Sequence, residues 1–190
     1  MVSQRLGVRP ATAADREWIF GVRHAVYAEE LGQHCGNPTG QLSDDLDEHG
    51  IVYLIATDDG SPAGFVSVTP PWVGRWSLDK YLSRADLPLL DTPDVFEVRL
   101  LTVAAPWRNT GAAALLMYAA LRWVQSRGGR QVVAMGRTDL AGMYTAAGLS
   151  PTGHTVVAGA VTFEVMAGEV AALAGRVQHR YAPALNRLAT

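Results

Sequence analysis

Apolar and polar positions alternate along the chain in a pattern that predicts a mixed α/β structure. Strands are expected over residues 5–10, 51–56, 63–69, 95–103 and 131–136, with a further pair around 151–155 and 158–166. Helical spacing predicts helices over 13–31 and 111–127, a short helix from Thr138 or Asp139 to Ala147, and a C-terminal helix. This order favours an α/β structure with a mixed sheet, in a single domain over residues 1–190.

One segment interrupts this order. Residues 70–94 are rich in Pro, Trp and Asp, with one helical turn expected at 77–83. Trp72, Trp76 and Tyr81 are large and need cover from solvent. We therefore expect an ordered excursion from the sheet rather than a linker between domains.

The composition narrows the class of protein. The chain has 190 residues, 48% of them hydrophobic and 18% charged, as in soluble globular proteins. The net charge of −2 gives no electrostatic reason to expect nucleic acid or an anionic membrane as partner. Cys35 is the single cysteine, which excludes an internal disulfide framework and fits a reducing compartment. With neither a signal-peptide core nor an apolar run of membrane-spanning length, we expect a cytoplasmic protein, of open oligomeric state.

The strand predicted over 95–103 carries two charges, Glu97 and Arg99. Strict alternation places them on one face, about 7 Å apart along the strand. Leu101 and Val103 share that face, and Phe96, Val98, Leu100 and Thr102 share the other. The two charges form either a structural ion pair at a sheet edge or a functional pair that faces a polar cleft. Burial of charge is costly unless the charge is paired or used, which makes the functional interpretation reasonable.

The sequence RNTGAA at residues 108–113 precedes the helix predicted over 111–127. A helix start presents unpaired N–H groups that suit an anion, and its small residues allow phosphate oxygens close to the backbone. Arg108 adds a charged donor. The motif is neither a Walker loop nor a dinucleotide fingerprint, since GxxxxGK and GxGxxG are absent.

Arg108-Asn109-Thr110-Gly111-Ala112-Ala113, followed on the next elements by Tyr144-Thr145-Ala146-Ala147-Gly148-Leu149, resembles the GCN5-related N-acetyltransferase (GNAT) superfamily. The resemblance covers residues 95–155 and implies a GNAT-like fold, with a mixed, mostly antiparallel twisted sheet flanked by helices. It also implies binding of a thioester. It implies that the backbone of Leu101 and Val103 bonds the pantetheine arm. It implies that the donor's phosphates are held by Arg108 and the amides of Asn109, Thr110, Gly111, Ala112 and Ala113. By the same resemblance, Tyr144 protonates the departing thiolate and Glu97 accepts a proton from the amine.

The N-terminal half is similar to a narrower branch, the acyl-homoserine lactone synthases and N-acyl amino acid synthases. The similarity rests on Arg23-x-x-x-Tyr27, Asp44-x-x-Asp47, Tyr53-Leu54-Ile55 and LDKYLSRADLP ahead of Glu97. It implies an acceptor-binding end of the cleft built by Arg23, Asp44, Asp47, Glu97 and Arg99. Arg23 and Arg99 would clamp a carboxylate and the aspartates an ammonium, unless the acidic residues 44–48 are only a solvated loop. Arg137, at the end of its strand, is a further candidate.

The chain also departs from the lactone synthases. They have a tryptophan where this chain has Gln33, an arginine where it has Val66 or Ser67, and Glu-x-x-Arg where it has Glu97-Val98-Arg99. They also tend to lose the R-x-x-G-x-A turn that this chain keeps. These departures argue against S-adenosylmethionine as acceptor and favour another amine, an amino acid or a similar metabolite.

The histidines show no metal-ligand spacing, so no metal is expected, and a catalytic His34–Cys35 pair is not favoured in so glycine- and proline-rich a loop. The leading hypothesis is an N-acyltransferase that moves an acyl group from a thioester directly to a primary amine of a small molecule. The donor is either acyl-coenzyme A or the phosphopantetheine arm of an acyl carrier protein. Alternatives are a non-catalytic thioester-binding or sensory module, and a lactone synthase that uses S-adenosylmethionine.

Overall fold

Seven strands form one continuous sheet in the computed structural model, which describes residues 6–176. The strands are β1 (Leu6–Pro10), β2 (Val52–Asp58), β3 (Ser61–Thr69), β4 (Val95–Val103), β5 (Gln131–Arg137), β6 (Ser150–Ala158) and β7 (Val161–Glu169). Their order in the sheet is β1-β2-β3-β4-β5-β7-β6. Only β4 and β5 pair in parallel among these neighbours; the other pairs are antiparallel. The predicted mixed, mostly antiparallel α/β fold is thus confirmed.

The helices occupy the predicted positions with altered geometry. The segment predicted as one helix over 13–31 is a 3₁₀ turn η1 (Ala13–Asp15), then α1 (Arg16–Arg23), then a π-helix η2 (His24–Glu30). The longest helix is α2 (Ala112–Ser126), and η8 (Thr138–Leu140) leads into α3 (Ala141–Ala147). Residues 170–176 are helical, and the remainder of the predicted C-terminal helix lies outside the described residues. No helix within residues 6–176 is long and apolar enough to span a membrane.

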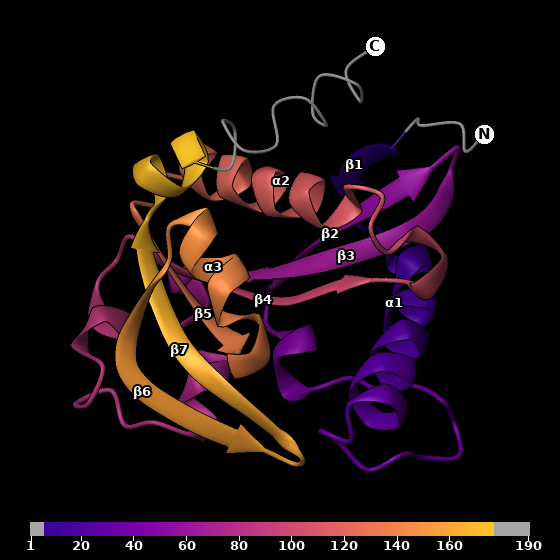
Figure 1. Ribbon diagram of the computed structural model, residues 1–190, viewed down its shortest axis with the longest axis horizontal. Helices are drawn as coiled ribbons and strands as arrows, with labels where there is room; N and C mark the ends of the chain where they lie inside the picture. Colours follow the sequence, from indigo (N-terminus) through magenta and orange to yellow (C-terminus); the bar gives the residue numbers. More distant parts are fainter. Residues whose placement is uncertain (1–5, 177–190) are drawn as a thin grey trace.

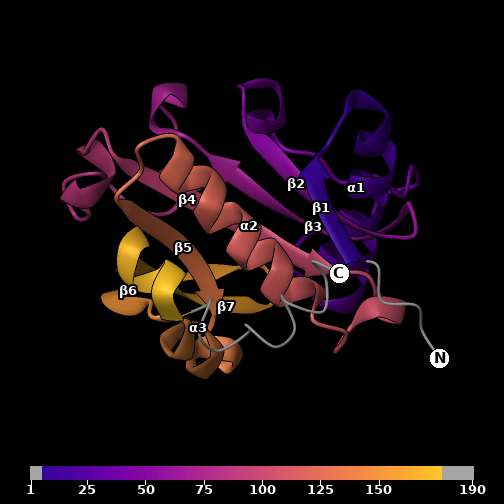
Figure 2. The ribbon, with the colours of Figure 1, turned by 90° about the horizontal axis from the view of Figure 1, so that it is seen from above.

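Helices cover both faces of the sheet, as the two views in Figure 1 and Figure 2 show. Because strand side chains alternate, Leu54, Val66 and Phe96 pack towards α2, whereas Tyr53 and Phe65 pack towards α1. The excursion over residues 70–94 covers the α1 face further along the sheet. It contains three 3₁₀ turns in place of the single expected turn: η4 (Pro71–Val73), η5 (Ser77–Lys80) and η6 (Pro88–Asp91).

The excursion is ordered, as expected, and it packs as a small core of its own. Trp76 and Leu78 are buried against Val95 and Val133 of the sheet. The indole N–H of Trp76 donates to the carbonyl of Leu90 at 3.1 Å, which closes the segment on itself. Trp72 remains largely exposed, edge-on to a phenylalanine of β4. The excursion thereby holds η5 over the middle of β4.

Strand β4 contains a β-bulge at Leu100, whose φ of +56° is left-handed. The register with β3 shifts here, so that Leu100 and Leu101 both lie opposite Val66. On its other side β4 pairs with β5 only from Val95↔Gln131 to Glu97↔Val133. Beyond Glu97 the two strands separate (Figure 1). The second half of β4 therefore has a side free of strand pairing.

The bulge corrects the predicted alternation of β4. Side chains alternate as expected through Arg99, but the extra residue at the bulge reverses the assignment beyond it. Leu101 and Val103 pack on the α2 face, and Leu100 packs on the α1 face. Thr102 likewise faces the η2 side, where its hydroxyl meets Tyr27. The sequence prediction was wrong here because strict alternation assumes an unbulged strand.

Candidate active site

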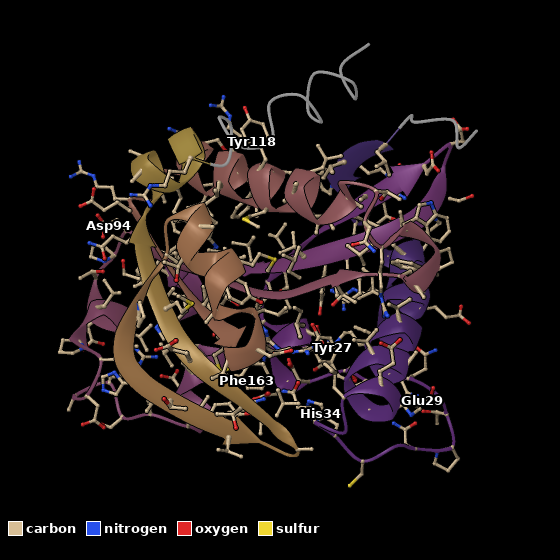
Figure 3. The ribbon with its side chains drawn as sticks, viewed as in Figure 1. Tyr27, Glu29, His34, Asp94, Tyr118 and Phe163 are labelled. Carbon is tan, nitrogen blue, oxygen red and sulfur yellow. The ribbon has the colours of Figure 1, made fainter. Side chains whose placement is uncertain are left out.

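A cleft of about 680 Å³ opens where β4 and β5 separate. Its walls come from η2 and the loop after it, the second half of β4, the start of α2, and α3 with the end of β5. Figure 3 shows Tyr27, His34 and Phe163 near one another beside this opening, contributed by η2, the following loop and β7. Elements from both halves of the chain thus meet at one concave site.

The cleft gathers most of the residues that the sequence singled out. Those on its wall are Arg23, Asp44, Arg99, Leu101, Val103, Arg108, Asn109, Gly111, Ala113, Arg137 and Tyr144. Glu97, Asp47, Thr110 and Ala112 are not on the wall. Residues that the sequence did not assign also line it: Tyr27, Glu30, His34, Ser77, Lys80 and Thr102. Arg137 lies on the wall while its guanidinium holds Asp139 at 2.6 and 3.0 Å.

One end of the cleft is the loop that leads into α2. Asn109 and Gly111 both have left-handed backbone, with φ of +66° and +96°, and Gly111 is the N-cap of α2. The amides of the first turn of α2 have no partner within their own helix, which is the general condition of helix N-termini. A conformation of this kind favours glycine at residue 111, because a side chain there would be strained. The loop therefore presents a small-residue helix start to the cleft, as predicted.

Arg108 is engaged in this structure by a residue from the opposite wall. Its Nη2 donates to both carboxylate oxygens of Glu30 at 2.8 and 2.9 Å, and its Nε donates to the carbonyl of Val103 at 3.3 Å. Both side chains of the ion pair are partly exposed. The charge expected to meet a phosphate is thus already balanced by a carboxylate of η2.

Tyr144 reaches the cleft from α3 with its ring against the backbone of β5. A Cβ added at Gly136 would lie 2.6 Å from Cδ2 of Tyr144, so the tyrosine occupies space that only a glycine leaves. Burial raises the pKa of Tyr144 to about 12, and the nearby phenol of Tyr27 adds to the rise. Tyr144 therefore keeps its proton at neutral pH and has one to donate.

Tyr27 crosses the cleft from η2 to β4. Its hydroxyl shares a hydrogen bond of 2.9 Å with the hydroxyl of Thr102. Burial raises the pKa of Tyr27. The π-helical turn that carries Tyr27 is a rare geometry that is frequent at functional sites. This hydrogen bond joins η2 to β4 at the cleft wall.

The other end of the cleft holds a buried ionic network around Arg23. Nη1 of Arg23 donates to Asp47 and to the hydroxyl of Tyr53, both at 2.8 Å, and Nη2 donates to Asp44 at 3.2 Å. Tyr53 in turn donates to Asp47 at 2.5 Å. Arg23 and Asp47 each expose only 3% of their side chains. Asp47 therefore orients Arg23 from behind and does not itself reach the cleft.

Arg99 shares Asp44 with Arg23 and has donor capacity left over. Its Nη2 donates to Asp44, while its buried Nη1 has no hydrogen-bond partner among residues 6–176. The side chain is 9% exposed and lines the cleft. Burial opposes the charge of Asp44, but Arg99 and then Arg23 outweigh it and lower the pKa of Asp44. A buried unpaired guanidinium N–H is costly, so Arg99 keeps a donor that its neighbours among the described residues do not satisfy.

Glu97 is fully buried, with 0% exposure. Its carboxylate accepts the backbone N–H of Ser77 at 2.9 Å and also the hydroxyl of Ser77. Glu97 and Arg99 share one face of β4, as predicted, and the charge of Glu97 helps to raise the pKa of Arg99 against the effect of burial. The carboxylate fastens η5 to β4, and Ser77 stands between it and the cleft wall. Direct contact of Glu97 with an acceptor is thereby blocked in this arrangement.

Among the described residues, no group of three or more His, Cys, Asp or Glu side chains could hold a metal ion. Cys35 is exposed and is not among the residues of the cleft wall, whereas His34 is. The unassigned wall residues carried weak signals in the sequence. Tyr27 belongs to the pattern Arg23-x-x-x-Tyr27, which gives it no role of its own, and His34 lies in a glycine- and proline-rich loop that does not favour catalysis.

Comparisons with known proteins agree with this geometry. The family model described as the acetyltransferase (GNAT) family matches residues 16–149. No curated protein sequence matches. Among solved structures, the chain is similar to the CoA-dependent acyl-homoserine lactone synthase BjaI (18% identity, 93% of this chain and 90% of that chain, TM-score 0.73). It is also similar to the AHL synthase LasI (16%, 91% and 96%, 0.72) and to Ard1 from Thermoplasma volcanium (17%, 87% and 97%, 0.59).

The family model spans the two motifs that suggested the superfamily, and the neighbouring structures share the fold over almost the whole chain. The splayed strands, the small-residue start of α2 and the tyrosine of α3 lie within the matched residues. The protein is therefore an acyltransferase that belongs to the GNAT family.

Proposed function

We propose that the protein is an N-acyltransferase that moves an acyl group from a thioester to a primary amine of an amino-acid-like small molecule. One observation carries the proposal: the same cleft has a phosphate-type loop at one end and the pair Arg99–Asp44 at the other. The unpartnered Nη1 of Arg99 suits a carboxylate, and Asp44, held ionised by two arginines, suits an ammonium. A substrate with both groups is an amino acid or a close relative.

The donor is proposed to lie along the free side of β4. The carbonyl of Val103 accepts from Arg108, which supports this placement because Arg108 is a proposed phosphate ligand. A second, apolar pocket of about 70 Å³ lies behind the splay, between α2, β5 and α3. Leu101, Met117 and Tyr144 line both this pocket and the cleft. The pocket is proposed to take the first carbons of the acyl chain, while Arg108 and the start of α2 are proposed to hold the phosphates of coenzyme A or of a carrier-protein arm.

The transfer is proposed to be direct. No cysteine lines the cleft, and the hydroxyl of Ser77 is committed to Glu97. Without an activated nucleophile, rate enhancement would come from holding amine and thioester together and from a proton donor for the thiolate. Tyr144, protonated at neutral pH, has that proton and lines both the cleft and the apolar pocket.

Calorimetric titration with coenzyme A, on the wild type and on Arg108→Ala, tests the donor site. Micromolar binding that the substitution weakens would support coenzyme A as donor. Absence of binding would direct the test to phosphopantetheinylated carrier proteins. Thiol release with a panel of L-amino acids then tests transfer. If the wild type bound the thioester but released no thiol with any of these amines, a non-catalytic thioester-binding module would be the better description.

A lactone synthase is the second candidate, because solved structures of that class share the fold. BjaI is known with S-adenosylmethionine and isopentyl-CoA bound. In this chain, however, Ser67 is buried beside Arg99 on the neighbouring strand, where the resemblance implies an arginine in that class. Methylthioadenosine release from S-adenosylmethionine in the presence of an acyl donor would favour this candidate over amino acid acylation.

A further inference from the structure

His34 lies at the acceptor end of the cleft on the loop that follows η2. The wall around it includes Asp44, Ser77, Lys80 and Arg99. Its side chain is exposed to the cleft and makes no hydrogen bond to another residue within 6–176. Figure 3 shows the imidazole between the end of η2 and β7, on the same side as Tyr27 and Phe163. Both ring nitrogens are therefore available to a ligand in the cleft.

The backbone around His34 is held from two directions. Its N–H donates to the carbonyl of Tyr27 at 3.1 Å, and that of Gln33 donates to the same carbonyl at 2.9 Å. On the other side, the N–H of Ala160 in the β6–β7 turn donates to the carbonyl of Gly32 at 3.1 Å. A Cβ added at Gly159 would lie 2.3 Å from the carbonyl oxygen of Gln33. The loop is thus clamped between η2 and the β6–β7 turn, and His34 is presented at a defined place.

The charges that face His34 come from several elements. Partial burial lowers the pKa of His34, and the positive charge of Arg23 on α1, with Lys80 on η5 and Arg99 on β4, lowers it further, against the opposing effect of Asp44. The imidazole is consequently neutral at pH 7 and can accept a proton. A neutral base with a pKa near the working pH is the condition for efficient general base catalysis.

The other carboxyl groups near the acceptor end are poorly placed for this task. Glu97 is enclosed behind Ser77. Asp44 accepts from two arginines and from the N–H of Leu46, and its lowered pKa makes it a weak base. Glu30 lies at the donor end, paired with Arg108. The proton of the attacking amine therefore has a better acceptor in an imidazole than in any of these carboxylates.

We propose that His34 is the general base that deprotonates the acceptor amine, an inference that rests on the proposed N-acyltransferase function. A nitrogen of the neutral imidazole takes a proton from the substrate ammonium. The amine lone pair then forms the C–N bond at the thioester carbonyl, and the C–S bond breaks. The thiolate leaves and takes the phenolic proton of Tyr144. The imidazolium and the amide nitrogen each release one proton to solvent, and the phenolate of Tyr144 regains one proton from solvent.

The test measures kcat/KM from pH 5 to 9 for the wild type, His34→Gln, Glu97→Gln and His154→Gln. Octanoyl-CoA and octanoyl-phosphopantetheine serve as donors, with the common L-amino acids and S-adenosylmethionine as acceptors and thiol release as readout. We expect His34→Gln to lower kcat/KM by about 100-fold or more and to abolish the fall in rate at acid pH. His154, on strand β6 and outside the cleft wall, is the matched control and should leave the profile unchanged.

Two further readouts separate a base from a structural residue. Imidazole added to His34→Ala should restore part of the lost rate, because the side chain lines an open cleft. The midpoint of the acid limb should equal the midpoint of the His34 imidazole followed by NMR, below the ordinary value of about 6.5. An acid limb that survives in His34→Gln and disappears in Glu97→Gln would overturn the proposal and assign the base to Glu97, acting through Ser77. Wild-type protein that neither binds nor cleaves either donor would overturn the proposed function itself.

Discussion

Two arginine–aspartate pairs of the N-terminal half, Arg23–Asp47 and Arg9–Asp15, allow one substitution to be judged against another. Arg23 and Asp47 each expose 3% of their side chains, whereas Arg9, which holds Asp15 at 2.7 and 2.8 Å, is 44% exposed. Arg23→Gln removes the only cation that contacts Asp47 among the described residues and leaves that carboxylate in the interior. Arg9→Gln removes a pair whose arginine is exposed, and its aspartate, 10% exposed, keeps the hydrogen bonds from the N–H and the hydroxyl of Thr12. The two variants change the same chemistry in different surroundings.

The expected magnitudes follow from that difference. Removing one partner of a buried ion pair costs about 3–5 kcal/mol, because the remaining charge is desolvated without compensation. An exposed pair contributes about 0–1 kcal/mol. For a chain of about this length, 1 kcal/mol lowers Tm by about 2–4 °C. Arg23→Gln should therefore lower Tm by about 6–20 °C and Arg9→Gln by less than about 4 °C.

Urea denaturation followed by circular dichroism, together with thermal scans, measures both variants. The double variant Arg23→Gln with Asp47→Asn should recover part of the loss, since it removes the stranded charge as well. Equal losses of stability in Arg23→Gln and Arg9→Gln would refute the reasoning. It would also be refuted if the double variant lost more unfolding free energy than its two single variants lost together. A loss as small as that of Arg9→Gln would show that water reaches Asp47 once Arg23 is replaced.

Three other outcomes are expected. Glu30→Gln should tighten coenzyme A binding severalfold in calorimetry, because it frees Arg108; unchanged affinity would show that this ion pair does not compete with the donor. Met117→Ala should shift the preferred acyl chain to a longer one by enlarging the apolar pocket, whereas Leu115→Ala on the same helix should not; equal preferences would remove the pocket from acyl recognition. Burial raises the pKa of Tyr144 to about 12, so the buried phenol contributes stability that is fully present below the ordinary tyrosine pKa of about 10. This stability is lost as pH rises towards 12, by roughly 1 kcal/mol at pH 11. Tyr144→Phe should abolish this part of the alkaline loss, and a stability difference between variant and wild type that stays constant from pH 9 to 11 would contradict it.

Much of the fold could be predicted because local sequence signals agree with the tertiary structure. Strand β4 begins and ends at the predicted residues, and Gly148 ends α3 with left-handed backbone, as expected of a helix C-terminus. The register details could not be predicted in the same way. The bulge at Leu100 depends on how β4 meets β3 rather than on any glycine or proline in the strand. The π-helical turn of η2 likewise leaves no mark in helical spacing.

The sequence predicts those site residues that belong to a local motif. It does not predict those whose position depends on contacts between segments far apart in the chain. Arg108 and Tyr144 occur in recognisable motifs, and both line the cleft. Whether Glu97 faces the cleft depends on Ser77, twenty residues earlier in the chain, whose turn lies over the carboxylate. His34 gains its place from the β6–β7 turn, far away in sequence. Side chains in one loop thus acquire their surroundings from segments that no local pattern connects.

The clamp between Gly32 and Ala160 has a mechanical consequence for the cleft. Strands β4 and β5 pair only near one end, so pairing alone would let their other ends move apart. The hydrogen bond from Ala160 to Gly32 joins the β6–β7 turn to the loop after η2. Because β7 pairs with β5, and Tyr27 of η2 is hydrogen-bonded to Thr102 of β4, this bond restrains the separation of β4 and β5 indirectly. Selectivity would then come from the fixed distances between wall residues rather than from closure around a substrate. Loosening the β6–β7 turn should broaden the range of amines at the expense of discrimination between them.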